Sequence, residues 1–233
     1  MPRDATLTEV AGGTRFLALG LALGATALVS ATALAAPGEP KLAFTAADQA
    51  KAKVVLLKTA ELPGKGWKAA KVDFARANPD CLVKNYSLAK LTATGQAGTE
   101  FTRDVSSGTF LVDSIARVFR TPTQAATAVK IRSQLGAGKC LGKTLASEAP
   151  FGQKATSTAK PFSLQGLALP SKGFKIIVHV TSTKQKYTLT GAVLEFHRGR
   201  TLSELSILTI DNGWSKAKVR SLAALTARRL AKS

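Results

Sequence analysis

One stretch constrains the fold of this chain more than any other: FRTPTQAATAVKIRSQLGAGKCL. Thr121 is a favourable helix N-cap, Pro122 suits the first helical position, and Gln124 stands where a capping box has Glu or Gln. Small apolar residues then recur at helical spacing, and Gly136 is expected to end the helix. Cys140 follows directly. The stretch therefore predicts a helix fixed at its end by a covalent link, which is a structural anchor and not a chemical site.

The N-terminal region has the pattern of an export signal. Arg15 precedes an uncharged apolar run, FLALGLALGATALVSATALAA, whose Ala-Leu-Ala segment is the small-x-small pattern that signal peptidases recognise. We expect cleavage after Ala35, which makes residues 1–35 a signal peptide and the mature protein secreted or extracytoplasmic. The alternative is an uncleaved membrane anchor over residues 16–36, because about 20 apolar residues suffice to span a bilayer.

The exported part contains two cysteines, Cys81 and Cys140. In an oxidising compartment an even number of cysteines predicts a disulfide bond. Neither cysteine has a CxxC spacing or a nearby histidine, so the sequence favours neither a metal site nor a catalytic thiol. Residues 36–42 are predicted to be a linker, and residues 43–233 a single extracytoplasmic domain.

Hydrophobic periodicity predicts an α+β domain, with an antiparallel β-sheet flanked by about three helices. The helices are expected at residues 45–60, in the anchor stretch, and at residues 215–232. Strands are expected at 67–74, 98–103, 108–120, 174–181, 186–197 and 201–210. Gly199 is expected to form a tight hairpin turn between the last two strands. Residues 148–170 have no sustained apolar period and are predicted to be a loop or the rim of a cleft.

The chain is strongly basic, with 33 Lys and Arg against 14 Asp and Glu, a net charge of +19. Residues 1–35 contain two bases and two acids, so the mature chain keeps the same net charge. Outside a cytoplasmic membrane, a field of this sign attracts anionic wall polymers, lipid headgroups and stray nucleic acid. The alternative is that the charge serves solubility alone. Nucleic acid is the least favoured partner, because aromatic residues for base stacking are few.

The sequence shows no catalytic or cofactor motif. His179 lies in an apolar strand segment, and His197 adjoins a turn. The chain has no G-x-S-x-G elbow, H-E-x-x-H, P-loop or G-x-G-x-x-G. No two carboxylates have a sequence spacing that suggests glycosidase chemistry, although spacing alone does not exclude it. The sequence therefore favours a non-enzymatic binding module without metal or cofactor, with a wall hydrolase using Asp or Glu, or an interaction protein, as alternatives.

The order of the motifs resembles that of a known family. A helix is followed by LPGKGW and a cysteine-bearing turn, a strand leads into VFRTPTQAATAV and KC, and a glycine hairpin precedes an alanine-rich helix. This order is similar to that of the extracellular sensor domains of mycobacterial serine/threonine kinases and related secreted actinobacterial proteins, over about residues 44–231. The resemblance implies a helix-flanked antiparallel sheet with a cleft that binds a ligand outside the cell. The chain departs from the family in having one cysteine pair where two are common, and in its basic charge.

Five side chains are candidates for ligand contacts: Trp67, Arg117, His197, Arg198 and Arg200. The tryptophan adjoins a glycine turn, where its indole could stack on a sugar or base, although packing against a helix end is the commoner role. The expected ligand is an anionic envelope polymer or lipid, or a small molecule. The sequence does not identify the ligand or the oligomeric state.

Overall fold

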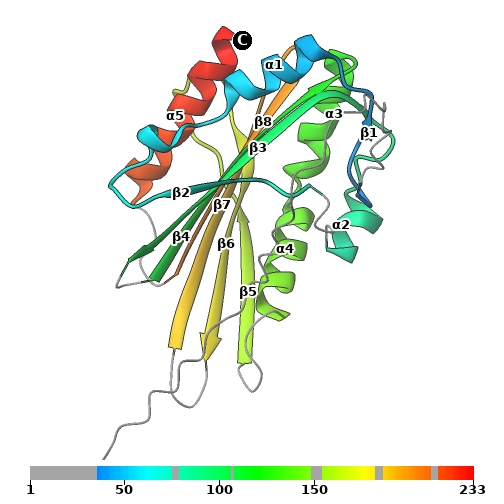
Figure 1. Cartoon of the computed structure of the whole chain (residues 1–233). Helices are drawn as coiled ribbons and strands as arrows, with labels where there is room; N and C mark the ends of the chain where they lie inside the picture. The colour runs from blue at the N-terminus through cyan, green and yellow to red at the C-terminus, as the bar shows by residue number, and fades with distance from the viewer. Residues whose placement is uncertain (1–35, 75–78, 106–107, 148–153, 182–185, 211–214) are drawn as a thin grey trace, which may run out of the picture. The chain divides into compact units, whose positions relative to one another are not determined.

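An eight-stranded, mostly antiparallel β-sheet organises the domain (Figure 1). The structure is a computed structural model. It describes residues 36–74, 79–105, 108–147, 154–181, 186–210 and 215–233. These residues belong to one compact unit, Thr32–Ser233. The predicted signal peptide, residues 1–35, lies outside the described residues.

The strands lie in the order β1-β3-β4-β8-β7-β6-β5, and β2 pairs with β3 beside β1. Their bounds are Lys41–Leu42 (β1), Lys68–Lys71 (β2), Thr92–Val105 (β3), Gly108–Phe119 (β4), Lys154–Pro161 (β5), Lys172–Thr181 (β6), Lys186–Arg198 (β7) and Thr201–Ile210 (β8). Only β1 runs parallel to its neighbour among the described pairs. Because β4 pairs with β8, the two halves of the chain meet at the centre of the sheet.

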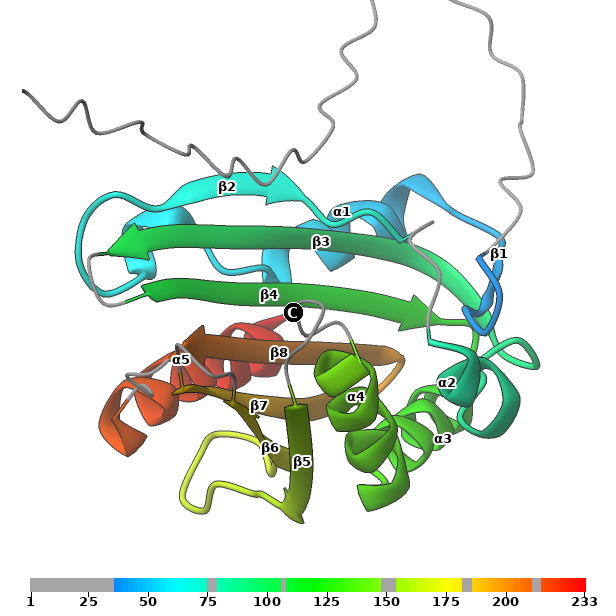
Figure 2. The same cartoon turned by 90° about the horizontal axis from the view of Figure 1, so that it is seen from below.

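Helices cover both faces of the sheet (Figure 2). Their bounds are Ala46–Val55 (α1), Asp80–Asn85 (α2), Pro122–Arg132 (α3), Leu135–Ser147 (α4) and Lys216–Lys232 (α5). Helices α1 and α5 pack on one face, here the α1/α5 face, whereas α3 and α4 pack on the other, the α3/α4 face. The fold class is thus confirmed, but the described residues form five α-helices where about three were expected. None of these helices has the length and hydrophobicity of a bilayer span.

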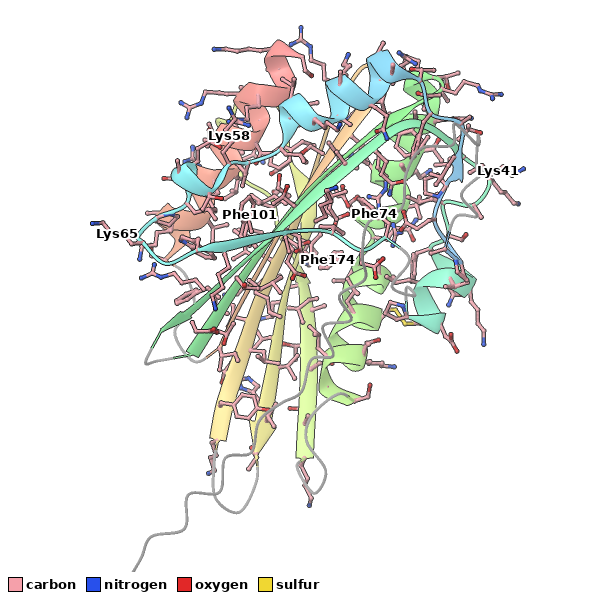
Figure 3. The ribbon with its side chains drawn as sticks, viewed as in Figure 1. Lys41, Lys58, Lys65, Phe74, Phe101 and Phe174 are labelled. Carbon is pink, nitrogen blue, oxygen red and sulfur yellow. A yellow bond between two sulfur atoms is a disulfide. The ribbon has the colours of Figure 1, made fainter. Side chains whose placement is uncertain are left out.

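Because successive side chains of a strand point to opposite faces, the apolar side chains form separate cores on the two faces of the sheet. Phe101, Phe196 and Leu205 are fully buried under α1 and α5. On the opposite face Phe174 packs with α4, and Phe119 packs with α3. Phe101 and Phe174 are labelled in Figure 3. Since neighbouring strand residues point to opposite faces, the side chains next to Phe196 in β7 and next to Leu205 in β8 are directed to the α3/α4 face.

The predicted helix starts are confirmed. The Thr121 hydroxyl accepts a hydrogen bond from the Gln124 amide at 3.2 Å, and the Gln124 side chain accepts one from the Thr92 amide at 3.1 Å. The latter bond ties α3 to β3. Thr45 caps α1 in the same way by accepting from the Asp48 amide at 3.1 Å. Helix α1 nevertheless ends at Val55, before the expected residue 60.

The expected helix end at Gly136 is wrong. Gly136 and Cys140 both lie inside α4. A Cβ on Gly138 would lie 2.6 Å from the Phe174 ring. The glycines of this segment therefore allow the helix to approach the sheet closely, and they do not terminate it. Cys140 forms the predicted disulfide with Cys81, with a Cα–Cα distance of 5.9 Å, and thereby joins α4 to α2.

Two segments that were expected to be irregular belong to the sheet. Residues 154–161, inside the predicted loop, form the edge strand β5. Their alternation is hard to recognise because the half-buried positions hold only small residues such as Ala155 and Ala159. The predicted linker, residues 36–42, contributes β1 and the buried side chain of Glu39.

Candidate functional site

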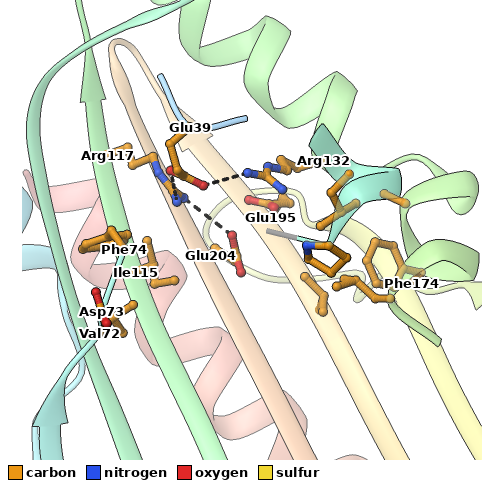
Figure 4. A pocket seen from close by; sticks show the side chains of 15 residues that line it. Glu39, Val72, Asp73, Phe74, Ile115, Arg117, Arg132, Phe174, Glu195 and Glu204 are labelled. Atoms are coloured by element: carbon orange, nitrogen blue, oxygen red, sulfur yellow. Dashed lines mark hydrogen bonds and ion pairs between the residues drawn. The ribbon is translucent and has the colours of Figure 1, made fainter. Parts of the chain in front are cut away.

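A pocket of about 200 Å³ opens on the α3/α4 face (Figure 4). Strands β4, β6, β7 and β8 form its floor, helices α2, α3 and α4 line it, and the segment after β2 completes it. Its lining contains nine apolar residues: Val72, Phe74, Pro79, Leu82, Ile115, Ala137, Leu141, Phe174 and Val193. The other lining residues are charged: Glu39, Asp73, Arg117, Arg132, Glu195 and Glu204. The pocket is thus amphipathic, with charged and apolar side chains contributed both by its floor strands and by the elements around them.

Arg117 of β4 is the central charge of the pocket, and it is buried, with 3% of its surface exposed. Its Nη2 donates to Glu39 at 2.7 Å, and its Nη1 lies 3.7 Å from a Glu204 oxygen. The second oxygen of Glu39 accepts from Arg132 of α3 at 2.9 Å. Burial acts to lower the pKa of Arg117, but the nearby carboxylates, Glu39 first, raise it overall. Glu39 therefore joins two arginines into one buried ionic cluster.

Glu195 differs from the other carboxylates of the pocket because its oxygens are unpaired. The strand register places it in β7 directly opposite Glu204 in β8. It is 1% exposed, and neither of its oxygens has a hydrogen-bond partner among the described residues. Burial, followed by repulsion from Glu204, raises the pKa of Glu195 well above its usual range. The pocket therefore contains a carboxyl group that favours its neutral form.

Some buried N–H groups of the cluster also lack a hydrogen-bond acceptor. The Nε and Nη1 of Arg117 and the Nε of Arg132 have no hydrogen-bond acceptor within the described part of the chain. An unsatisfied buried polar group costs about 1–3 kcal/mol. The cluster thus presents both donors and an acceptor whose hydrogen bonds the described protein groups do not satisfy.

A further carboxylate lies beside the pocket. Asp113 of β4 stands opposite Glu100 of β3, on the same face as Glu204. Burial, together with repulsion from Glu100 and Glu204, raises the pKa of Asp113 to about 7. The α3/α4 face is therefore rich in carboxylates, although the chain as a whole is strongly basic.

The Asp113→Asn variant is expected to remove part of the pH dependence of stability. Between about pH 4 and 7 the folded protein binds more protons at Asp113 than the unfolded chain does. Stability therefore falls as pH rises, by at most about 1.4 kcal/mol per pH unit from this group. Urea unfolding at pH 5.5 and pH 8 should show that the free energy of unfolding falls less between these pH values in the variant than in the wild type. Asp104→Asn, at an exposed position, should behave like the wild type, and parallel behaviour of all three proteins would contradict the assignment.

Of the predicted ligand contacts, only Arg117 lines the pocket. Trp67 packs against the core of the α1/α5 face, and its Nε1 donates to the Pro63 carbonyl at 3.2 Å. The guanidinium of Arg103 lies 5.9 Å from the centre of the indole ring. These contacts give the tryptophan a packing role, the commoner alternative in the sequence analysis.

The remaining predicted contacts lie around the β7–β8 hairpin, away from the pocket lining. Arg200 donates to Asp48 at 2.8 Å and thereby ties the hairpin to α1. Arg198 is exposed, and His197 is half-buried on the same face as Glu195. Gly199 has a φ of 54°, as expected for the hairpin turn. Arg200 therefore has a structural contact, and the structure gives Arg198 and His197 no place in the pocket.

Sequence reasoning missed Glu39, Arg132, Glu195 and Glu204. One signal for the last two was present, because a tight hairpin at Gly199 places Glu195 opposite Glu204. Glu39 gave no signal, since it lies in the predicted linker.

Comparisons with known proteins add no relatives. Neither a protein-family model nor a curated protein matches this chain. Within the described ranges, no three His, Cys, Asp or Glu side chains are grouped so as to hold a metal ion. The function must therefore be argued from the geometry and charge of the pocket.

Proposed function

We propose that this protein is a non-enzymatic, extracytoplasmic binding module that takes a small ligand into the pocket on the α3/α4 face. The observation that carries the proposal is the unpaired, buried carboxyl of Glu195 beside the unpaired donors of Arg117 and Arg132. Buried polar groups in folded proteins are nearly always hydrogen-bonded. A polar guest in the pocket would supply the missing partners.

The lining indicates the class of ligand. A hydroxyl or ammonium group would donate to Glu195, and an acceptor would face the guanidinium groups of Arg117 and Arg132. Phe74 and Phe174 offer apolar surface to the rest of the molecule. At about 200 Å³ the pocket is smaller than the roughly 300–1,000 Å³ of typical drug-sized sites. We therefore propose an amino acid, an amino sugar or a polyol of similar size.

The extracytoplasmic location rests on two features. The N-terminal apolar run has the pattern of a signal peptide, and the described part of the chain contains the Cys81–Cys140 disulfide. Disulfides persist mainly in oxidising compartments. The resemblance to extracellular sensor domains agrees with this location and stays a prediction.

A hydrolase is the second candidate, and the register of Glu195 with Glu204 favours it. A neutral acid beside a second carboxylate is the arrangement that glycosidases use. The small volume and the burial of Glu195 argue for a compact guest and against a wall polymer as substrate. Time-dependent product formation from a bound sugar, abolished in Glu195→Gln, would establish the hydrolase in place of the binding module.

Titration calorimetry with alanine, lysine, glucosamine and glycerol tests the binding proposal. At least one of these probes should bind the wild type, and Glu195→Gln should weaken that binding about tenfold, because the amide replaces one acceptor oxygen of the carboxyl by an NH2 group that can only donate. Asp104→Asn serves as the matched control, since it removes an exposed carboxylate and should leave affinity unchanged. Equal binding by the wild type and Glu195→Gln, or no binding of any probe, would overturn the pocket as the site.

A further inference from the structure

The opposite face of strands β5, β6 and β7 has a different chemistry from the pocket. Helix α5 packs against β7 and β8, and β5, β6 and the first half of β7 extend beyond it (Figure 1). We call the residues of 154–160, 175–181 and 186–190 that point to the α1/α5 side the open sheet face. This face consists mainly of exposed lysine and threonine side chains.

The strand register orders these side chains into rows across the sheet. At one end Lys154 stands opposite Thr181, and Thr181 stands opposite Lys186. At the other end Lys160 stands directly opposite Lys175. The two ends are six residues apart along a strand, which is about 20 Å.

Mostly polar side chains lie between the two lysine rows. Thr156 and Thr188 stand on either side of His179 in one row, and Thr158 and Thr190 stand on either side of the half-buried Ile177 in the next. Thr156, Thr158 and His179 are exposed. The open sheet face thus presents two cationic rows separated by hydrogen-bonding groups.

No carboxylate offsets this charge on the open sheet face. The chain has no Asp or Glu between Glu148 and Glu195. Each carboxylate on a described strand occupies a register position on the α3/α4 side: Glu100, Asp104, Asp113, Glu195 and Glu204. Like charges directly opposite each other in a sheet repel, and Lys160 and Lys175 stand opposite each other. A bound anion would relieve this repulsion.

We infer that the open sheet face binds a linear polyanion of the cell envelope, built from polyol phosphate units. Phosphates would pair with the lysine rows, and polyol hydroxyls would hydrogen-bond to the threonines between them. A chain of repeated charges can contact both rows, which are too far apart for one small anion. The inference goes beyond the proposed function, because it assigns a second, polymeric ligand to the opposite face of the sheet.

Two other classes of partner fit this face less well. The exposed large hydrophobic residues of the described chain are Phe44 and Val54, near and in α1, and Ile177 on the open sheet face is half-buried, so the face offers no exposed apolar anchor for a membrane. It also has no aromatic side chain for base stacking, because Tyr187 and Phe174 occupy positions on the opposite side. Charge and hydroxyl groups together therefore favour a polyol phosphate polymer.

Fluorescence anisotropy with labelled poly(glycerol phosphate) tests the inference. The variant Lys154→Gln, Lys160→Gln, Lys175→Gln and Lys186→Gln should lose at least about tenfold in affinity, with a salt slope reduced by about one for each lysine that contacts phosphate. The control replaces Lys41, Lys53, Lys58 and Lys65 by glutamine, which removes the same charge around β1, α1 and the loop before β2 (Figure 3). Its affinity should stay within about twofold of the wild type.

Each contrary result has a defined meaning. Equal losses of affinity for the polymer in both variants would overturn the inference, because the attraction between protein and polymer would then depend on net charge alone. Binding of wild-type protein to phosphatidylglycerol vesicles but not to the polymer would overturn it in favour of a membrane surface. Glu195→Gln should bind the polymer normally, and the four-lysine variant should keep its affinity for the small-molecule probe. The proposal for the pocket and the proposal for the open sheet face can therefore be rejected independently of each other.

Discussion

Replacing both cysteines, Cys81→Ser with Cys140→Ser, is expected to lower the free energy of unfolding by about 4 kcal/mol. The disulfide closes a loop across a sequence separation of 59 residues, and the chain-entropy model assigns this stabilisation to a loop of that length. It also fixes α2, whose six residues are too few to form a stable helix alone. Urea unfolding of the oxidised wild type and the double variant measures the difference.

The effect of the disulfide should be largest around α2. Pro79 and Leu82 line the pocket at this helix, so the double variant should lose affinity for the small-molecule probe even under conditions where it remains folded. Amide hydrogen exchange should accelerate in α2 well before α5. Reductant should destabilise the wild type to the level of the double variant and leave the variant unchanged. A difference in unfolding free energy below about 1 kcal/mol would show that packing alone fixes this part of the fold.

Helix starts could be predicted from the sequence because their determinants are local. Thr45 and Thr121 each cap a backbone amide three residues ahead, which is visible in a short window. Helix ends could not be predicted in the same way. Gly136 resembles a terminator, but the neighbouring Gly138 shows that glycines in this segment serve close packing against Phe174, a residue in a distant strand. Local patterns do not distinguish these two uses of glycine.

The pocket was only partly predictable for the same reason. Arg117 was among the five predicted ligand contacts, and it shares its strand face with Ile115 and Phe119. Its partner Glu39 lies 78 residues away, in a segment with too little hydrophobic pattern to be recognised as part of the sheet. Arg198 and Arg200 were predicted as ligand contacts and flank the hairpin turn. Burial and pairing, which the sequence does not show, decide which charges form the cluster.

Substituting the central cation of the pocket, Arg117→Met, is expected to lower the free energy of unfolding by about 3–5 kcal/mol. Methionine fills much of the volume, but Glu39 then keeps Arg132 as its one remaining ion-pair partner, and Glu195 and Glu204 lose the nearby charge of Arg117. Breaking a buried ion pair costs this much. The loss should be greater at pH 8 than at pH 5.5. The charge of Arg117 acts to lower the pKa of Glu195, so without the guanidinium this already raised pKa rises further. The folded state then binds still more protons than the unfolded chain, and stability falls more steeply with pH.

The surface pair of Arg200 provides the matched control for this substitution. Arg200→Met also removes an arginine bonded to a carboxylate, Asp48, but its side chain is 39% exposed and the expected loss is about 1 kcal/mol or less. Combining Glu39→Gln with Arg117→Met should cost less than the sum of the two single substitutions, because both break the same 2.7 Å ion pair, and the double-mutant cycle measures their coupling. If Arg117→Met were no more destabilising than Arg200→Met, the cluster would be solvated and the orphaned carboxyl of Glu195 would not require a guest. A large, pH-dependent loss, together with strong coupling between Arg117 and Glu39, would instead show that the domain maintains a costly buried charge cluster at the position where the small ligand is proposed to bind.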